Sequence, residues 1–391
     1  MAFLPLSGLR VVDVTTSYAG PYCTQLLAAL GADVVKVEPP GGDEARAWGP
    51  PFVDGDSALF LAANAGKRSL AIDLRRGADA VRRLAEQADV FVQSLRPGLA
   101  DELGLGAERL RAANERLVYC SIGSYGHVGP KRLRPGYDAL MQAAGGVISV
   151  TGEPGRPGVR VGVSLIDQGT GGWAALAILA ALLERATTGT GRLIEVSLYE
   201  TALAYAGYHL IGYLGSGQLP SPQGTGFPSI APYQVHRARD GGLMIAAGND
   251  RLFGALCDVL QLPELAEDPR FTTNPDRVRN RAELTALLEG RLGQDDRTAW
   301  VERLADAGVP AAPVATMADI ATDPQTEALG ILQLLGGATL LAPPFNLDGE
   351  RPAHASAPPA LGAHTREVLA EAGLSEPEIE ELVAAGIVRL G

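Results

Sequence analysis

Short apolar runs alternate with segments of helical spacing over the first half of the chain. Runs rich in valine, isoleucine and leucine predict strands at residues 10–16, 33–38, 69–74, 89–95 and 117–122. Between them, helical spacing of apolar side chains predicts helices at residues 21–30, 78–87 and 107–113. Gly31 follows the first helix, where glycine commonly ends one. This alternation predicts a parallel, doubly wound α/β sheet.

The pattern changes in the second half. Residues 168–185 are almost wholly apolar and predict a long helix buried in the core, followed by a strand at 192–197. Residues 215–232 are rich in Gly, Pro and Ser without periodicity, which predicts a loop or linker. A smaller mixed domain is predicted from segments 242–247, 252–260, 281–292, 299–307 and 310–314. The chain then becomes proline-rich and ends with a helix predicted at 365–372.

Composition narrows the class of protein. A length of 391 residues exceeds the usual size of one core, so we expect two domains or one core with a large insertion. The net charge of −12 argues against a nucleic-acid partner. The three cysteines show no disulfide or metal spacing. Without a signal-peptide pattern, and with its longest apolar stretch at 173–183, the chain is expected to be cytoplasmic and without a membrane partner.

Asp167 is the first candidate for a reactive group. It lies between a strand-like run and the predicted helix that starts at residue 168. The N–H groups and macrodipole of a helix N-terminus stabilise a carboxylate there. Small residues at 169–172 leave room for a ligand to approach. A plain helix cap is equally compatible with an aspartate in this position, and one side chain can play both roles.

Further candidates lie near turns and strand ends. Tyr137 and Asp138 follow a Pro-Gly turn, where they can line a site or serve as a cap with an interface aromatic. Basic residues occur at 66–76, at Arg96 and at Arg134. Because ligands of open α/β sheets bind at the carboxyl ends of strands, and guanidinium groups match phosphate geometry, these positions indicate a phosphate-bearing ligand.

Several common catalytic patterns are absent from the sequence. The first strand–turn–helix unit has neither G-x-G-x-x-G nor G-x-x-x-x-G-K-[ST], and no G-x-S-x-G elbow occurs. The five histidines show no metal spacing. These observations favour nucleophilic chemistry by a carboxylate.

Collinear motifs over nearly the whole chain resemble those of the family III CoA-transferases, the CaiB/BaiF or formyl-CoA-transferase-like type. The matching stretches are LSGLRVVDVTTSYAGP, LGADVVKVEPPGGD, AGKRSLAIDLR, GYDALMQAAGG, DQGTGGWAALAILAALLER, TGRLIEVSLYETAL, PSIAPYQVH, IAAGNDRLF, DPRFTTNPDRVRNR, AGVPAAPV, DPQTEALG and LGAHTREVLAEAG. Such a set is specific for the superfamily and not for a substrate.

The resemblance implies a Rossmann-like, doubly wound large domain and a smaller α/β domain, in a homodimer whose two chains interlock. The implied division places the first part of the large, CoA-binding domain at 1–200 and a linker with the active-site loop at 201–232. The small domain follows at 233–325, and residues 326–391 return to the large domain.

The resemblance also implies roles for individual residues. Asp167 matches the catalytic aspartate, Tyr137 and Asp138 belong to its site, and Gly224 and Gly226 match a mobile glycine loop. The implied CoA contacts are Tyr18, Ala19, Ile72, Asp73, Leu74, Arg75, Ser94, Leu95, Arg96 and Arg134. Ser94-Leu95 departs from the common Asn-Phe, and Pro39 and Glu102 stand where some members have basic residues.

The implied activity is transfer of CoA from an acyl-CoA thioester to a carboxylic acid through aspartyl anhydride and aspartyl-CoA intermediates. CoA thioesters are then substrates, and no metal or permanently bound cofactor is expected. We expect backbone N–H groups near Gly169 and Gly171 to stabilise the oxyanions. Two alternatives remain: an α-methylacyl-CoA racemase, although Tyr137 stands where racemases have histidine, and a non-catalytic CoA-thioester binding protein. The residues identify neither the donor nor the acceptor acid.

Overall fold

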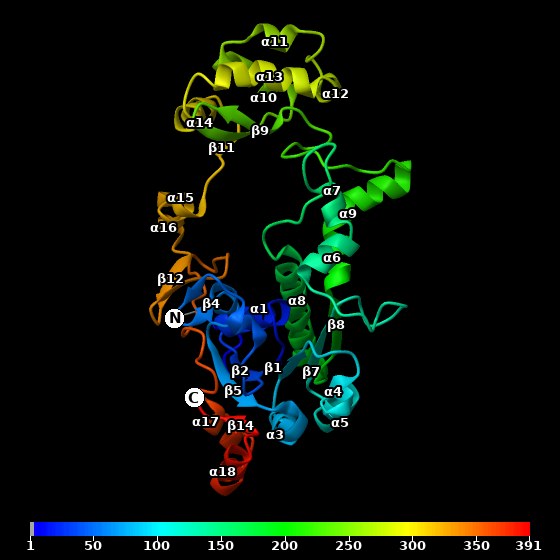
Figure 1. The fold of residues 1–391 in the computed structure, drawn as a ribbon, viewed down its shortest axis with the longest axis vertical. Coiled ribbons are helices and arrows are strands. Elements are labelled where there is room, and N and C mark those ends of the chain that lie inside the picture. The colour runs from blue at the N-terminus through cyan, green and yellow to red at the C-terminus, as the bar shows by residue number, and fades with distance from the viewer. Residues whose placement is uncertain (1–3) are drawn as a thin grey trace. The chain divides into compact units, whose positions relative to one another are not determined.

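The computed structural model describes residues 4–391, which form two compact units (Figure 1). The larger unit combines the chain up to Val147 with Val161–Gly215 and Gln325–Gly391. The smaller unit combines Ile148–Arg160 with Ser216–Pro324. The four-part division implied by the family resemblance stays a prediction. Residues 201–216 of its expected linker are helical.

A seven-stranded sheet forms the centre of the larger unit, with the strand order β14-β5-β2-β1-β6-β7-β8. The strands are β1 (Arg10–Val14), β2 (Asp33–Glu38), β5 (Lys67–Ile72), β6 (Val90–Gln93), β7 (Val118–Gly123), β8 (Leu193–Ser197) and β14 (Val388–Arg389). Every neighbouring pair is parallel except β14 with β5. The chain builds outward from β1 to β5 and then crosses to β6 on the other side. This switch leaves a crevice at the carboxyl ends of β1 and β6.

Alternating residues of the strands face two separate hydrophobic layers. Val11 belongs to a cluster with α1 (Ala19–Ala29) and α8 (Leu165–Thr188). Val12 faces the opposite cluster, which four other helices of the unit cover. Those helices are α3 (Leu74–Glu86), α5 (Ala107–Ala113), α17 (Thr365–Glu371) and α18 (Glu376–Ala384). Burial on both faces explains the continuous apolar runs of the strands, and the predicted doubly wound α/β fold is confirmed.

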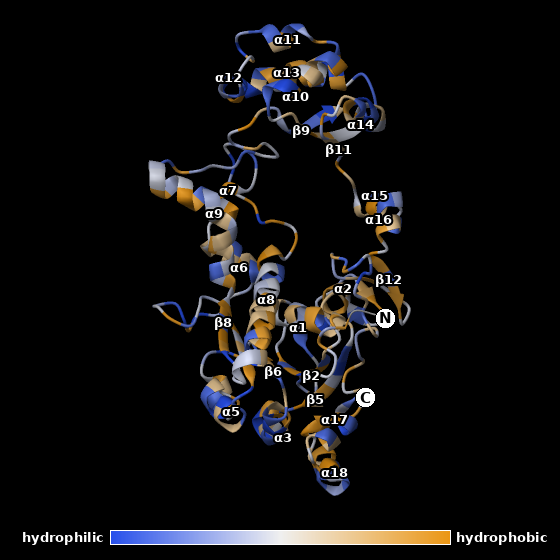
Figure 2. Ribbon diagram, turned by 180° about the vertical axis from the view of Figure 1, so that it is seen from behind, coloured by the Kyte–Doolittle hydropathy of each residue, from blue (hydrophilic) through white to orange (hydrophobic). Residues whose placement is uncertain are grey.

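Helix α8 is longer and less buried than the sequence predicts. It begins at Leu165, ahead of residue 168, and packs one side against α1. Its other side exposes Trp173, Leu176 and Leu183, and Figure 2 shows hydrophobic residues along much of the helix. The expectation of a helix buried in the core therefore holds for one side of α8 only. Among the described residues, α8 alone has the length and apolar composition of a membrane span, a test that core helices of soluble proteins also pass.

Further elements of the larger unit surround the sheet. They are α2 (Ala58–Leu61), α4 (Leu99–Glu102), α6 (Asp138–Ala144), α9 (Leu198–Ser216) and the hairpin of β12 (Leu332–Leu335) with β13 (Ala338–Leu341). Helix α9 is kinked at Gly207, whose backbone is not helical. The sequence pattern did not predict α9, because its apolar residues follow no single face.

The smaller unit is a three-stranded antiparallel sheet packed against helices. The sheet has the order β11-β10-β9, with β9 (Tyr233–Ala238), β10 (Gly241–Ala246) and β11 (Ala311–Pro313). The helices are α10 (Asp250–Leu260), α11 (Glu264–Glu267), α12 (Asn274–Arg279), α13 (Arg281–Leu292), α14 (Arg297–Asp306) and α15 (Met317–Ala321). Its own core gathers around the buried Phe253, Phe271 and Trp300. The unit therefore has the core of a separate mixed domain.

Candidate active site

A cavity of about 820 Å³ opens at the carboxyl ends of β1, β6 and β7. Seven of the residues singled out from the sequence line it: Ala19, Ser94, Leu95, Arg96, Arg134, Tyr137 and Asp167. They come from the turns after β1 and β6, from the loop before α6 and from the first turn of α8. The fold therefore brings the candidate carboxylate and two candidate phosphate-binding arginines to one hollow.

The start of helix α8 is capped by Asp138 and not by Asp167. Asp138 is buried, and its Oδ2 atom accepts hydrogen bonds from the backbone N–H groups of Ile166, at 2.8 Å, and Asp167, at 3.2 Å. Its Oδ1 atom accepts a bond from the Gln142 side chain at 2.6 Å. The helix-cap interpretation of Asp167 is therefore wrong. Because Asp138 takes up the N–H groups, the Asp167 carboxylate stays free for chemistry.

The Asp167 carboxyl group has an unusually high proton affinity. Burial, and secondly the negative charge of Asp138, raise its pKa to about 7. Within residues 4–391, no lysine or arginine contributes an opposing attraction to this carboxyl group. A carboxylate that is destabilised in this way is a stronger base and nucleophile than an exposed one, while a substantial fraction stays ionised at neutral pH.

The expected oxyanion donors lie in a different place. Gly169 and Gly171 are inside α8, where each N–H group bonds the carbonyl four residues earlier, so this expectation is wrong. Helix α1 offers an alternative pair. In the part of the chain that the structure describes, the N–H groups of Ala19 and Gly20 have no hydrogen-bond partner, and both residues line the cavity with Asp167. The first turn of a helix presents such groups to an anion.

Close contact of the two helices fixes α1 beside α8. A Cβ atom added at Gly171 would stand 2.5 Å from the carbonyl oxygen of Ala19, so only glycine allows this approach. Gly20 is equally confined, since an added Cβ would lie 2.4 Å from the Thr15 side chain. The first contact fixes the start of α1 against α8 at Gly171, one helical turn after Asp167.

Tyr18 lies against the catalytic candidate from another side. Its buried hydroxyl accepts a hydrogen bond from the Gln168 side chain at 3.2 Å. Burial raises the pKa of Tyr18, the Gln168 bond lowers it, and the charge of Asp167 raises it further. Tyr18 and Gln168 line a second cavity of about 440 Å³, which also contacts α2 and the β12–β13 hairpin. Tyr18 therefore lines this second cavity and also lies within electrostatic reach of Asp167.

Other sequence candidates lie outside the larger cavity. Ile72 is fully buried at the end of strand β5, Asp73 caps α3 through the N–H of Arg75, and Arg75 is exposed. Leu74 packs against the same core layer. Their contacts with CoA stay a prediction.

The predicted loop glycines belong to the smaller unit. Gly224 has a positive φ of 60° and donates its N–H to Gly152, and the Gly226 N–H bonds Gln223. Their expected role as a cover for the active site stays a prediction.

The structure also adds residues that sequence reasoning missed. Arg132 lines the cavity with Arg96 and Arg134, and its place two residues before Arg134 was a signal that went unused. Trp48 packs edge-on against the exposed Tyr137, with ring centroids 6.2 Å apart, although nothing in its local sequence indicated this contact. Three guanidinium groups now mark the cavity as a site for a polyanionic ligand.

Acidic side chains near the cavity reduce the positive charge that its arginines supply. Arg96 forms an exposed ion pair with Glu102 at 3.1 Å. His127 and Glu195 line the cavity beyond β7, with 3.4 Å between His127 Nδ1 and Glu195 Oε1. Residues 4–391 contain no cluster of three or more His, Cys, Asp or Glu side chains that is arranged to hold a metal ion.

The model of the family described as CoA-transferase family III matches residues 6–365. The chain belongs to this family. A succinyl-CoA:glutarate CoA-transferase from Mus musculus is 38% identical to this family III chain, over 98% of the chain and 90% of the relative. An acetyl-CoA:oxalate CoA-transferase from Acetobacter aceti is 39% identical, over 88% of the chain and 90% of the relative.

A solved structure is similar over the whole fold. The crystal structure of a CaiB/BaiF family protein from Brucella suis has a TM-score of 0.86 and 43% sequence identity, and the match covers 94% of this chain and 99% of the other. The chain is therefore a CoA-transferase of the family III type, which confirms the resemblance found in the sequence.

Proposed function

We propose that the protein moves CoA from an acyl-CoA thioester to a free carboxylic acid, with Asp167 as the nucleophile. The free Asp167 carboxylate, whose pKa is raised to about 7 beside a cavity with three arginines, carries this proposal. The arginines would bind the phosphates of CoA, which leaves the thioester end for the region of α1 and α8.

The first half of the reaction would form a covalent enzyme–CoA species. The Asp167 carboxylate attacks the thioester carbonyl, the C–S bond breaks, and an acyl-aspartyl anhydride and CoA thiolate result. The thiolate then attacks the aspartyl carbonyl and expels the donor carboxylate, which leaves an aspartyl-CoA thioester. Each attack places negative charge on a carbonyl oxygen, and the free N–H groups of Ala19 and Gly20 are suited to receive it.

The second half reverses these steps with another acid. The acceptor carboxylate attacks the aspartyl-CoA thioester, and a new anhydride and CoA thiolate form. The thiolate takes the new acyl group and restores the Asp167 carboxylate. No net proton or redox change occurs, so the exchange needs only the two carboxylates and the thiol of CoA.

The partner most consistent with the surface is a second copy of the chain, in the interlocked dimer that family resemblance implies. Helix α8 exposes Trp173, Leu176 and Leu183, and helix α9 exposes Ile211 and Leu214. Large apolar side chains of this number favour a covered interface. Light scattering should therefore give the mass of two chains, and a single-chain mass would reject the dimer.

Mass spectrometry of CoA species would test the transfer reaction. The protein would be incubated in D₂O with several acyl-CoA donors and a panel of free acids that includes succinate, glutarate and oxalate. A new thioester that is lost in Asp167→Ala supports the proposal and identifies both substrates. Deuterium at the α-carbon of a branched acyl-CoA without a new thioester would instead indicate a racemase.

A further inference from the structure

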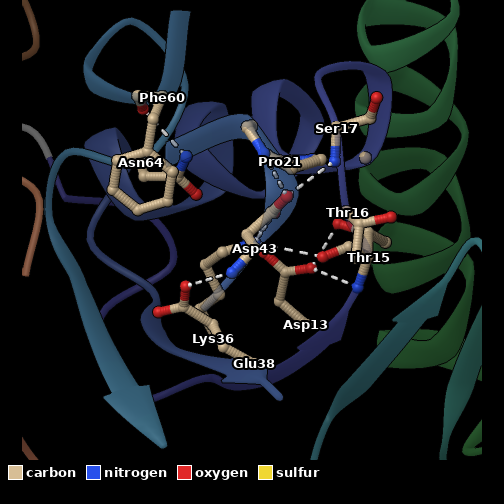
Figure 3. Close-up of polar contacts among 12 residues, drawn as sticks. Asp13, Thr15, Thr16, Ser17, Pro21, Lys36, Glu38, Asp43, Phe60 and Asn64 are labelled. Carbon is tan, nitrogen blue, oxygen red and sulfur yellow. Dashed lines mark hydrogen bonds and ion pairs between the residues drawn. The ribbon is translucent and has the colours of Figure 1, made fainter. Parts of the chain in front are cut away.

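A charged cluster lies beneath the turn that joins β1 to α1 (Figure 3). Its ionisable members are Asp13, Lys36, Glu38, Asp43, Arg46 and Lys67. All but Arg46 are at most 3% exposed, and the three acids balance the three bases in formal charge. We call this set the buried ion cluster. It belongs to neither cavity lining.

Two ion pairs form the part of the buried ion cluster nearest the turn. Lys36 Nζ lies 2.8 Å from Asp43 Oδ2, and Lys67 Nζ lies 3.0 Å from Asp13 Oδ2. Burial alone would raise the pKa of Asp13, but the charges of Lys67 and Lys36 outweigh it and hold the pKa below its usual value. The charges of Asp13 and Lys67 thus depend on each other, since burial lowers the pKa of Lys67 to about 8 while the charge of Asp13 raises it.

The same side chains bind backbone atoms of the turn. Lys36 donates to the Thr15 carbonyl at 3.1 Å, Asp43 accepts from the Ser17 N–H at 3.2 Å, and Lys67 donates to the Pro21 carbonyl at 2.9 Å. Figure 3 shows the Lys36 and Asp43 side chains beside the turn residues Thr15 and Ser17. Backbone on both sides of Tyr18 and Ala19 is therefore attached to charged groups that cannot move independently.

The turn has a conformation that needs such support. Ser17 has a positive φ of 72°, which is unfavourable for a residue with a side chain. Ser17, Ala19 and Gly20 line the larger cavity with Asp167, and the N–H groups of Ala19 and Gly20 are free. The strained turn is therefore held where it can act on a ligand.

Stability alone does not account for a cluster of this kind. Desolvation of buried charges is costly, and apolar side chains of similar volume often give equal or greater stability. These charges bind the β1–α1 turn at three backbone positions. A role in fixing the position of that turn explains them better than a gain in stability does.

We infer that Lys36, Asp43 and Lys67 are positioning residues that hold the N–H groups of Ala19 and Gly20 in place for the oxyanion of the thioester reaction. The inference rests on the proposed function. These three side chains act through the turn and touch no substrate themselves. Loss of one pair should therefore impair the transition state far more than substrate binding.

A matched control exists on the other side of the buried ion cluster. Ser69 is fully buried, donates to Glu38 at 2.8 Å and accepts from the Gly362 N–H at 2.9 Å. It binds no atom of the β1–α1 turn. Ser69→Ala thus disturbs the same cluster and lowers stability without releasing the turn.

The test compares Asp43→Asn with Ser69→Ala in CoA transfer by the full-length protein. In Asp43→Asn an amide NH₂ group can face Lys36, which must then move and release the Thr15 carbonyl. We expect kcat per folded molecule to fall roughly 100-fold, while KM for the acyl-CoA changes less than about threefold. Ser69→Ala should retain kcat within about twofold once the folded fraction is measured by denaturant unfolding.

Each outcome separates the two proposals. If the wild-type protein forms no new thioester, the proposed function fails. If it does, but Asp43→Asn keeps wild-type kcat or Ser69→Ala loses as much, the positioning role is overturned. Should Asp43→Asn fail to fold, the double variant Lys36→Met/Asp43→Asn replaces the pair with neutral side chains and must show the same loss of kcat.

Discussion

Two groups of aspartates in the larger unit differ in their electrostatics. Asp13 and Asp43 each face a lysine within 3.0 Å. Asp138 accepts hydrogen bonds from neutral N–H groups, and Asp167 lines the cavity. Neither forms an ion pair within the described residues. The pKa of Asp13 accordingly lies below its usual value, whereas burial and Asp138 raise the pKa of Asp167 to about 7.

This contrast separates charges that hold the fold from a charge that can react. A carboxylate with a cationic partner loses basicity and gains a fixed position. In a carboxylate without a cationic partner, the ionised form is less stable at neutral pH and is therefore a better nucleophile. The difference lies in the neighbours, because all four side chains are aspartates.

Removal of the unpaired charge should produce the largest change in activity. We expect Asp167→Asn to reduce CoA transfer by at least roughly 1000-fold, because an amide cannot form the anhydride on which the proposed transfer depends. Its folded-state pKa is above the unfolded value, so the stability contribution of Asp167 is full below pH 4 and is lost as pH rises through about 7. Denaturant unfolding at pH 8 should therefore show Asp167→Asn to be more stable than wild type.

If Asp167→Asn stabilised the protein as much at pH 5 as at pH 8, the raised pKa of Asp167 could not be the cause of the stabilisation. Retained transfer activity in Asp167→Asn would remove Asp167 from the reaction altogether.

Removal of a paired cation should instead produce the largest change in stability. Lys67→Met leaves the buried Asp13 without its ion-pair partner, and we expect the free energy of unfolding to fall by about 3–5 kcal/mol. Denaturant unfolding provides the measurement. Lys67→Met/Asp13→Asn should recover part of the loss, since no uncompensated charge remains.

The exposed pair of Arg192 and Glu184 serves as the control for this prediction. Arg192→Met should leave the unfolding free energy essentially unchanged, because solvent screens both groups. Equal losses in Lys67→Met and Arg192→Met would show that burial of the pair is irrelevant.

A smaller effect should appear when the charge beside Asp167 is removed. The wild-type kcat/KM should rise with pH through about 7 as Asp167 ionises. Asp138→Asn keeps an oxygen acceptor for the α8 N–H groups but removes the negative charge, so the acid limb of the profile should move to lower pH by roughly one unit. If the acid limb of the kcat/KM profile does not move in Asp138→Asn, burial alone sets the pKa of Asp167.

The sequence predicted regular elements well where the pattern is local. The strand at 33–38 and the helices at 107–113 and 281–292 have the predicted bounds, because apolar periodicity and nearby breakers define both ends. The start of α8 was misplaced, since its cap is Asp138 from a segment distant in the chain. The same long-range contact explains why the role of Asp167 at the helix start was misjudged.

The buried ion cluster could have been suspected from the sequence. Asp13, Lys36 and Lys67 each interrupt or begin an otherwise apolar strand, and those strands prove to be neighbours. Their pairing could not be derived, because it depends on strand order and on the turn that brings in Asp43. The free N–H groups of α1 could not be predicted from the sequence either. Only the structure shows that they have no hydrogen-bond partner among the described residues.

The contact of Gly171 with the Ala19 carbonyl has a consequence for how such an enzyme can change over time. Backbone, and not a rotatable side chain, sets the spacing between α1 and the helix that carries Asp167. Substitutions in the cavity rim, at positions such as Leu95 or Arg132, leave that spacing untouched. The reacting centre can thus stay intact while substitutions remodel the rim for a new acid.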